Sequence, residues 1–129
     1  MEKLFNFVSV IGGVVGGTLI ALLGGWDQLI IALIILMVLD YITGVLQSIY
    51  NKELSSKIGF KGLLKKVLIL CVVAVSVVIE KDFGVQAVRE VVIMFFACNE
   101  GISVLENATK MGIPLPKKLQ DVLLQIKDK

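Results

Sequence analysis

The feature that most constrains this chain is a run of 23 residues without a charged side chain, from Leu4 to Trp26. At about 1.5 Å per residue, such a helix is about 35 Å long and can cross a hydrocarbon core of about 30 Å with some tilt. The competing interpretation is a cleaved signal peptide, but Glu2 beside Lys3 makes a poor basic region and no clean small-residue cleavage site follows. We therefore favour a retained membrane span at about residues 5–25.

Two more segments have an apolar character suited to a span. The second, 28–50, is uncharged except for Asp40 near its midpoint. The third, 63–79, is long enough only if Lys65 and Lys66 at its start extend their ammonium groups to the lipid headgroups. An ionised carboxylate at mid-membrane costs about 2.5 to 3.5 kcal/mol on insertion scales. Asp40 is therefore expected to face protein or water.

The fourth segment, 88–106, is the most polar of the four, because Arg89, Glu90 and Glu100 interrupt it. The placement of charge nevertheless favours four spans over three. The connection 52–66 carries five lysines and one glutamate, the next connection is slightly acidic, and the tail is again rich in lysine. Under the positive-inside rule this alternation predicts that both termini lie in the cytoplasm.

The composition also indicates a membrane protein. Of 129 residues, 57% are hydrophobic and 19% are charged, whereas a soluble domain is about 45 to 50% apolar and about a quarter charged. Near the C-terminus, four apolar residues recur at helical spacing opposite polar ones and predict an amphipathic cytoplasmic helix at 116–127. These four are Leu119, Val122, Leu123 and Ile126. The expected fold is a single all-α membrane domain, 1–129, with a bundle of about four transmembrane helices and this short helix.

Small residues recur at strict four-residue spacing along the first span: Gly13, Gly17, Ala21 and Gly25. In lipid, where hydrophobicity cannot drive helix association, such a face lets two helix backbones approach closely. The pattern predicts close packing without naming the partner. Packing inside one molecule and self-association into a homo-oligomer remain equal alternatives.

Polar residues form a stripe on the second span and another on the fourth. The residues expected to line a shared lumen are Asp40, Thr43, Gln47, Asn99, Glu100 and Ser103. Within each set the spacing of three or four residues gives one helix face, so the two stripes are expected to face each other or water. Under the plainer alternatives, the carboxylates are protonated and only hydrogen-bond one helix to another, or Asp40 caps a broken helix. An ionisable residue inside a membrane is by default a functional hypothesis.

The basic connection is interpreted as a cytoplasmic loop that contacts lipid headgroups or solvent. Its lysines are Lys52, Lys57, Lys61, Lys65 and Lys66. Few aromatic residues accompany them, so nucleic-acid binding is not expected. The chain has no histidine, Cys71 and Cys98 do not form a CxxC pair, and no phosphate loop is present. We therefore expect no catalytic residue, no metal site and no cofactor.

Two blocks of sequence resemble the signatures of the phage holins of the toxin-secretion/phage-lysis group. Leu39–Lys66 reads LDYITGVLQSIYNKELSSKIGFKGLLKK, and Asn99–Leu119 reads NEGISVLENATKMGIPLPKKL. They occur in the family's order and at about its spacing. The matching positions are Asp40, Tyr41, Gly44, Ser56, Lys57, Gly59, Phe60, Lys61, Gly62, Asn99, Glu100, Gly101, Glu106, Asn107, Pro114 and Pro116.

This resemblance implies a protein of the bacterial cytoplasmic membrane that accumulates and then assembles into large lesions. A phage endolysin or a large toxin would cross through these lesions without necessarily binding the protein, and the host cell would lyse. The family has no catalytic residues to carry over. An alternative from another class is a small ion or solute channel, or a transporter subunit, built on Asp40 and Glu100. A third is an assembly factor or holin antagonist that oligomerises without permeabilising the membrane.

Overall fold

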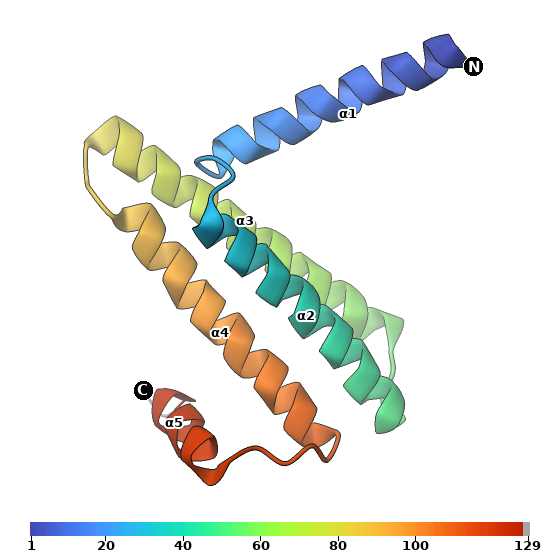
Figure 1. The fold of residues 1–129 in the computed structure, drawn as a ribbon, viewed down its shortest axis with the longest axis vertical. Helices are drawn as coiled ribbons and strands as arrows, with labels where there is room; N and C mark the ends of the chain where they lie inside the picture. The colour runs from blue at the N-terminus through green and yellow to red at the C-terminus, as the bar shows by residue number, and fades with distance from the viewer. Residues whose placement is uncertain (128–129) are drawn as a thin grey trace.

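In the computed structural model, which describes residues 1–127, the chain is helical throughout, and those residues contain no strand. The helices are α1 (Glu2–Leu22), α2 (Gln28–Tyr50), α3 (Ser56–Phe83), α4 (Val88–Lys110) and α5 (Lys117–Lys127). Helices α2, α3 and α4 run up and down beside one another (Figure 1). Helix α1 leaves one end of this bundle, and α5 lies near the opposite end. The arrangement therefore consists of a three-helix bundle with a separate helix at its N-terminus.

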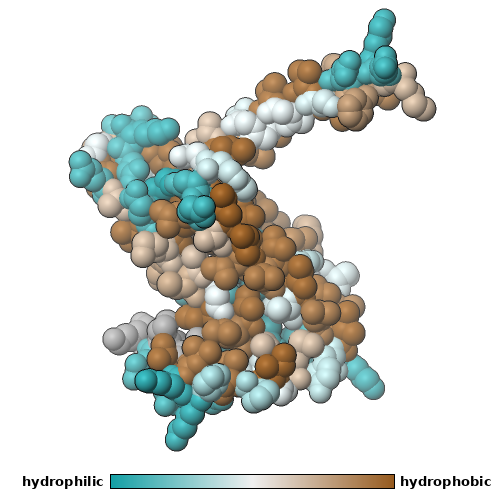
Figure 2. Space-filling model, viewed as in Figure 1, coloured by the Kyte–Doolittle hydropathy of each residue, from teal (hydrophilic) through white to brown (hydrophobic). Residues whose placement is uncertain are grey.

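Helices α1, α2 and α3 are long and apolar enough to cross a membrane. This result confirms the all-helical class and three of the expected spans by length and composition. Helix α4 is not among these three, so its crossing of the membrane remains a prediction. Figure 2 shows the apolar surface covering much of α1 and the bundle, with hydrophilic residues gathered at the α3–α4 turn and at the opposite end. Lipid is the neighbour that suits so large an exposed apolar surface.

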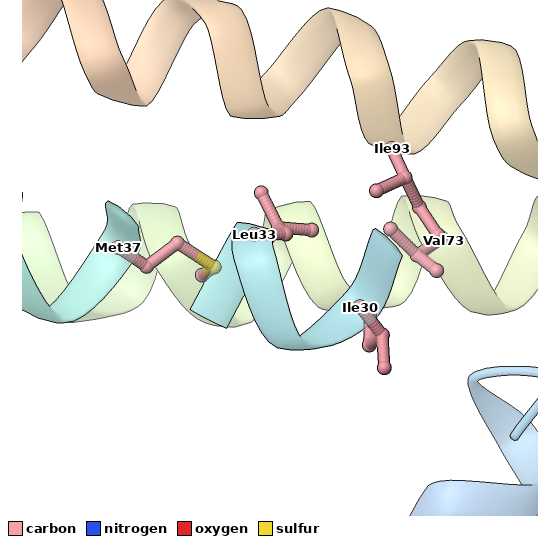
Figure 3. Packing of buried hydrophobic residues seen from close by; sticks show 5 residues of the cluster. All are labelled: Ile30, Leu33, Met37, Val73 and Ile93. Atoms are coloured by element: carbon pink, nitrogen blue, oxygen red, sulfur yellow. The ribbon is translucent and has the colours of Figure 1, made fainter. Parts of the chain in front are cut away.

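The core of the bundle is small and joins all three of its helices. It consists of Ile30, Leu33 and Met37 on α2, Val73 on α3 and Ile93 on α4, and Figure 3 shows Ile93 directed toward Val73. Helix α4 packs most extensively on α2 and also contacts α3, whereas α2 and α3 touch each other little. The most polar long helix is therefore the one that holds the bundle together.

Helix α3 begins earlier than the sequence analysis expected. The connection after α2 is short, and the chain is helical from Ser56 onward, where the sequence analysis placed a loop as far as residue 66. Lys57, Lys61 and Lys65 are spaced four residues apart on this first part of α3 and are all exposed. The interpretation of these lysines as loop residues was wrong, because nothing between residues 56 and 66 breaks a helix strongly enough to end it.

Helix α1 makes no packed interface with the bundle, and none of its residues is buried. A Cβ atom placed on Gly13 or Gly17 would meet nothing within 4 Å. Gly25, which was assigned to the same face, lies outside α1 in the connection to α2 with φ of +110°. The small-residue face of α1 is therefore Gly13, Gly17 and Ala21, and it is unpartnered within this molecule.

Helix α5 follows the turn that contains Gly112 and the two prolines. Leu119 is partly buried and Val122 is exposed. The side chains of Leu123 and Ile126, the other two residues of the expected apolar stripe, lie outside the described residues. Docking of α5 on the bundle or on a membrane surface remains a prediction.

Candidate functional site

The most unusual feature of the bundle is an ion triad inside it, formed by Asp40 on α2, Lys66 on α3 and Glu100 on α4. The Nζ atom of Lys66 lies 2.7 Å from Oδ2 of Asp40 and 2.7 Å from Oε2 of Glu100. The three side chains are 19%, 14% and 8% exposed, respectively. Asp40 and Glu100, one from each polar stripe, therefore share the ammonium group of Lys66. Lys66 itself belongs to neither stripe.

The triad lies near the middle of the bundle. Asp40 is the thirteenth of 23 residues in α2, and Glu100 is the thirteenth of 23 in α4. These two helices run in the same direction, so the two residues are at the same level (Figure 1). Charges at this depth require partners, because hydrocarbon offers none. Lys66 provides that partner for both.

Asn107 adds hydrogen bonds from an uncharged side chain beside the triad. Its Nδ2 group donates to Oδ1 of Asp40 at 3.2 Å and to the hydroxyl oxygen of Thr43 at 3.0 Å. The hydroxyl of Thr43 in turn donates to the carbonyl oxygen of Leu39 at 2.7 Å. Asp40 thus has a cation on one carboxylate oxygen and an amide on the other. Among the described residues, no fully buried side-chain nitrogen or oxygen lacks a hydrogen-bond partner.

A cleft of about 830 Å³ opens beside the triad, between the three helices of the bundle, and both polar and apolar side chains line it. Its lining includes Asp40 and Gln47 from α2, Lys66 from α3, and Asn99, Glu100 and Ser103 from α4. Five of the six residues expected to line a lumen are therefore brought to one cleft. Thr43 does not line the cleft, although its hydroxyl oxygen accepts a hydrogen bond from Asn107, which does. Whether the cleft becomes part of a lumen remains a prediction.

Two small residues of α3 leave space for this cleft. Gly59 and Gly62 face Tyr41 of α2, and a Cβ atom on Gly59 would lie 3.4 Å from the Tyr41 hydroxyl oxygen. The tyrosine ring therefore occupies the position that larger side chains on α3 would take. These three residues all belong to the first of the two sequence blocks that carry the holin resemblance, Leu39–Lys66.

Lys66 was assigned to a basic loop and was expected to reach the headgroups, and this assignment was wrong. It points into the bundle, whereas its neighbour Lys65 is exposed. A signal for this difference exists in the sequence. Lys66 precedes Val73 by seven residues and Val77 by eleven, so it shares the helix face that these buried valines define. The exposed lysines of α3 follow a different face.

The cysteines and the potential metal-ligating residues form no cluster in the part of the chain that the structure describes. No group of three or more potential metal-ligating residues was found among the described residues. Cys71 and Cys98 are both exposed and far apart in sequence, and neither forms a disulfide. The cleft can hold water and pair charges between helices.

Comparison with known proteins shows the family to which this chain belongs. A sequence model of the bacteriophage holin family matches residues 17–128. The chain belongs to the bacteriophage holin family. This match confirms the resemblance carried by the two sequence blocks, and it extends through the bundle and α5. Together with the three apolar helices, it makes this holin-family chain a multi-pass membrane protein.

Proteins similar to this holin-family chain occur in bacteria and in a phage. It is 41% identical to an uncharacterized 14.9 kDa protein in the nagH 3′ region of Clostridium perfringens, over 100% of this chain and 99% of that one. It is also 41% identical to an uncharacterized protein of Listeria monocytogenes, over 96% and 87% of the two chains. A probable holin of Bacillus phage phi105 is 32% identical, over 70% and 68%. No solved structure matches this chain.

Proposed function

We propose that this holin-family protein assembles in the bacterial cytoplasmic membrane into large, non-selective lesions. Through them an endolysin or a large toxin crosses the membrane, and loss of the barrier leads to lysis. The observation that carries the proposal is the division of the molecule into two parts. Lys66 pairs with Asp40 and Glu100, the two carboxylates of the polar stripes, inside the bundle, and the apolar helix α1 is left without a partner.

The closed bundle explains how a single copy can stay in the membrane harmlessly. Asp40, Glu100 and Asn107 satisfy one another or Lys66, so no charged group of the triad faces lipid alone. The cleft beside them already contains polar side chains from three helices. When copies accumulate and the helices of neighbouring bundles separate, these side chains become the wall of a shared aqueous opening.

Helix α1 provides the surface through which copies meet. Its small-residue face, Gly13, Gly17 and Ala21, has open space in front of it. Because close backbone packing is the main attraction between apolar helices in lipid, a second α1 is a suitable occupant. In the assembly, α4 crosses the membrane with the bundle to which it is packed, and both termini lie in the cytoplasm.

The decisive experiment is regulated expression in a bacterium that contains a folded cytoplasmic reporter enzyme, with a membrane-impermeant dye in the medium. We expect a period without damage, followed by abrupt dye entry and release of active reporter. Expression at the same level of Gly17→Leu should delay or abolish both signals, while Val15→Leu, a change on the opposite side of α1 from the small-residue face, should leave them unchanged. Dye entry or reporter release on an unchanged schedule in Gly17→Leu would contradict assembly through this face.

The same experiment separates the other two functions. A channel or transporter built on Asp40 and Glu100 would change ion conductance without releasing a folded enzyme. The pairing of both carboxylates with Lys66 argues against such a path, because neither is available to an incoming cation in this structure. An antagonist would associate with itself but would give neither dye entry nor reporter release in this experiment. Either result would replace the proposal.

A further inference from the structure

A second charged cluster lies at the opposite end of α4 from its C-terminus, where α1 joins α2. Its centre is Arg89, whose side chain is 7% exposed. The guanidinium donates to both carboxylate oxygens of Asp27, with Nη1 at 2.6 Å from Oδ2 and Nη2 at 3.1 Å from Oδ1. This bidentate arrangement is the strong form of an arginine–carboxylate pair.

The same guanidinium also binds the main chain of the connection between α1 and α2. Its Nε donates to the carbonyl oxygen of Leu23 at 2.7 Å, and Nη2 donates to that of Gly25 at 3.4 Å. With Asp27, three residues of the connection are thus held by one side chain. We call this set of contacts the Arg89 clamp. The sequence analysis treated Arg89 only as an interruption of the fourth span.

The backbone of the connection is shaped around the clamp. Gly24 has φ of +87°, and a Cβ atom there would overlap Nε of Arg89 and lie 2.7 Å from its Cδ. A larger residue therefore cannot occupy this position without moving the arginine. The Asp27 carboxylate also accepts the main-chain N–H of Ile30 at 3.1 Å, so the clamp is continuous with the first turn of α2.

The clamp is anchored on its other side as well. The main-chain N–H of Arg89 donates to Oε1 of Glu80, near the end of α3, at 3.2 Å. Arg89 itself lies in the first turn of α4. Three bundle helices are therefore joined at one point to the connection that leads into α1, where Leu23 also packs on the core and Gly24 lies near Val77.

We propose that Arg89 is a positioning residue that fixes the direction in which α1 leaves the bundle, and that it thereby presents α1 to a second copy of this chain. The first part concerns one molecule, and the second rests on the proposed function. Without the clamp, Gly24 and Gly25 would let α1 sample many directions. Ordering α1 during association would then lower the affinity, as it does for any interface that is not preorganised.

The first test measures the direction of α1 in the purified protein in detergent micelles, where lysis plays no role. The two native cysteines are first replaced (Cys71→Ser, Cys98→Ser), and spin labels are attached to Val14→Cys in α1 and Val38→Cys in α2. Pulsed electron paramagnetic resonance measures the distance between the two labels. Unlabelled protein is added to suppress signals between molecules. Both positions are exposed. We expect a single narrow distance peak with Arg89, and loss of that peak in Arg89→Ala.

Two further variants and a control pair make the result decisive. Asp27→Asn keeps an acceptor for the start of α2 but removes the charge that Arg89 binds, and it should also broaden the distribution. Arg89→Lys retains one ion pair without the fork and should give an intermediate width. Labels on Val38→Cys and Val75→Cys, both on the bundle, should keep their narrow peak in every variant.

A narrow α1 peak that survives in both Arg89→Ala and Asp27→Asn would overturn the proposal. Loss of the bundle peak in both variants would also overturn it, because Arg89 would then maintain the bundle and not the direction of α1. The second part is tested by reporter release at equal expression, where Arg89→Ala should be delayed. If the wild-type protein released no reporter, the proposed function would fail while the distance result would still stand.

Discussion

Helices α1 and α4 have opposite properties, and the contrast explains how this small membrane protein is built. Helix α1 has 21 residues, is apolar enough to cross a membrane and has no buried residue. Helix α4 carries charged residues along its length and is not among the three apolar spans, yet it packs against both other helices of the bundle. Of these two helices, the apolar one therefore has no packed partner in the molecule, whereas the polar one packs between two other helices.

The physical reason is that lipid chains are as apolar as leucine. An apolar helix such as α1 gains nothing from the hydrophobic effect by packing on its own bundle, so only close-packing surfaces decide where it goes. A polar helix such as α4 has no such freedom, because Glu100 and Asn107 require hydrogen-bonding partners among the apolar helices of the bundle. Four changes test this contrast, beginning with the one that we expect to destabilise the bundle most.

The largest loss is expected from Lys66→Met. This change removes the cation that both carboxylates of the triad bind. Breaking a buried ion pair by removing one partner costs about 3 to 5 kcal/mol. The free energy of unfolding in mixed micelles, followed by circular dichroism, should fall by about this amount. The matched control is Lys65→Met, one residue away and exposed, and an equal loss in the control would show that the triad does not stabilise the bundle.

A smaller loss is expected from Asp40→Asn. The amide keeps the size of the side chain and a contact with Asn107, while Lys66 retains Glu100. We expect a decrease in unfolding free energy of about 1 to 3 kcal/mol, the range for a weakened buried hydrogen bond. Reporter release in cells provides the functional measurement. Release at the wild-type time would mean that the charge of Asp40 has no part in triggering.

Acidification should act on the Arg89 clamp, and only at low pH. The hydrogen bond from Arg89, followed by that from the main chain of Ile30, holds the pKa of the Asp27 carboxyl below its ordinary value of 3.8. A depressed carboxyl pKa adds stability above the unfolded value and loses it as the pH falls through the folded value. The distance between labels on α1 and α2 should therefore be constant at neutral and mildly acidic pH and broaden only below about pH 4. Broadening near neutral pH would show that Asp27 is not the group responsible.

No loss of bundle stability is expected from Gly17→Leu. A side chain at this position has open space within 4 Å, so the unfolding free energy of the bundle should match that of the wild type. Self-association in the membrane should nevertheless decrease, because leucine separates the two backbones. A variant that unfolds more easily would indicate that α1 packs on its own bundle after all.

The helical class, the apolar spans and the approach of the two polar stripes could be predicted from the sequence, because each depends on local periodicity. Asp40 and Glu100 lie on helix faces that spacing alone identifies, and the structure brings both to the same lysine. The role of Lys66 was missed because it was counted with its neighbours as a topology signal. Its register with Val73 was the information that distinguished it.

The Arg89 clamp could not be predicted in the same way. Arg89 and Leu23 are 66 residues apart in sequence, and they meet only after α2, α3 and α4 have packed. Periodicity within one helix says nothing about such a contact. The partner of α1 was equally inaccessible, since a face of small residues predicts a close approach without specifying which helix approaches.

Disulfide cross-linking along α1 tests most directly whether copies of this holin-family protein meet through the small-residue face. In the Cys71→Ser, Cys98→Ser background, single cysteines replace Gly13 and Gly17 on that face, and Val15 and Leu19 away from it. We predict cross-linked dimers at the two glycine positions, appearing before reporter release, and none at the other two. Equal cross-linking at all four positions, or release of the reporter without any cross-link at Gly13 and Gly17, would contradict the division of the molecule into a closed bundle and an associating helix.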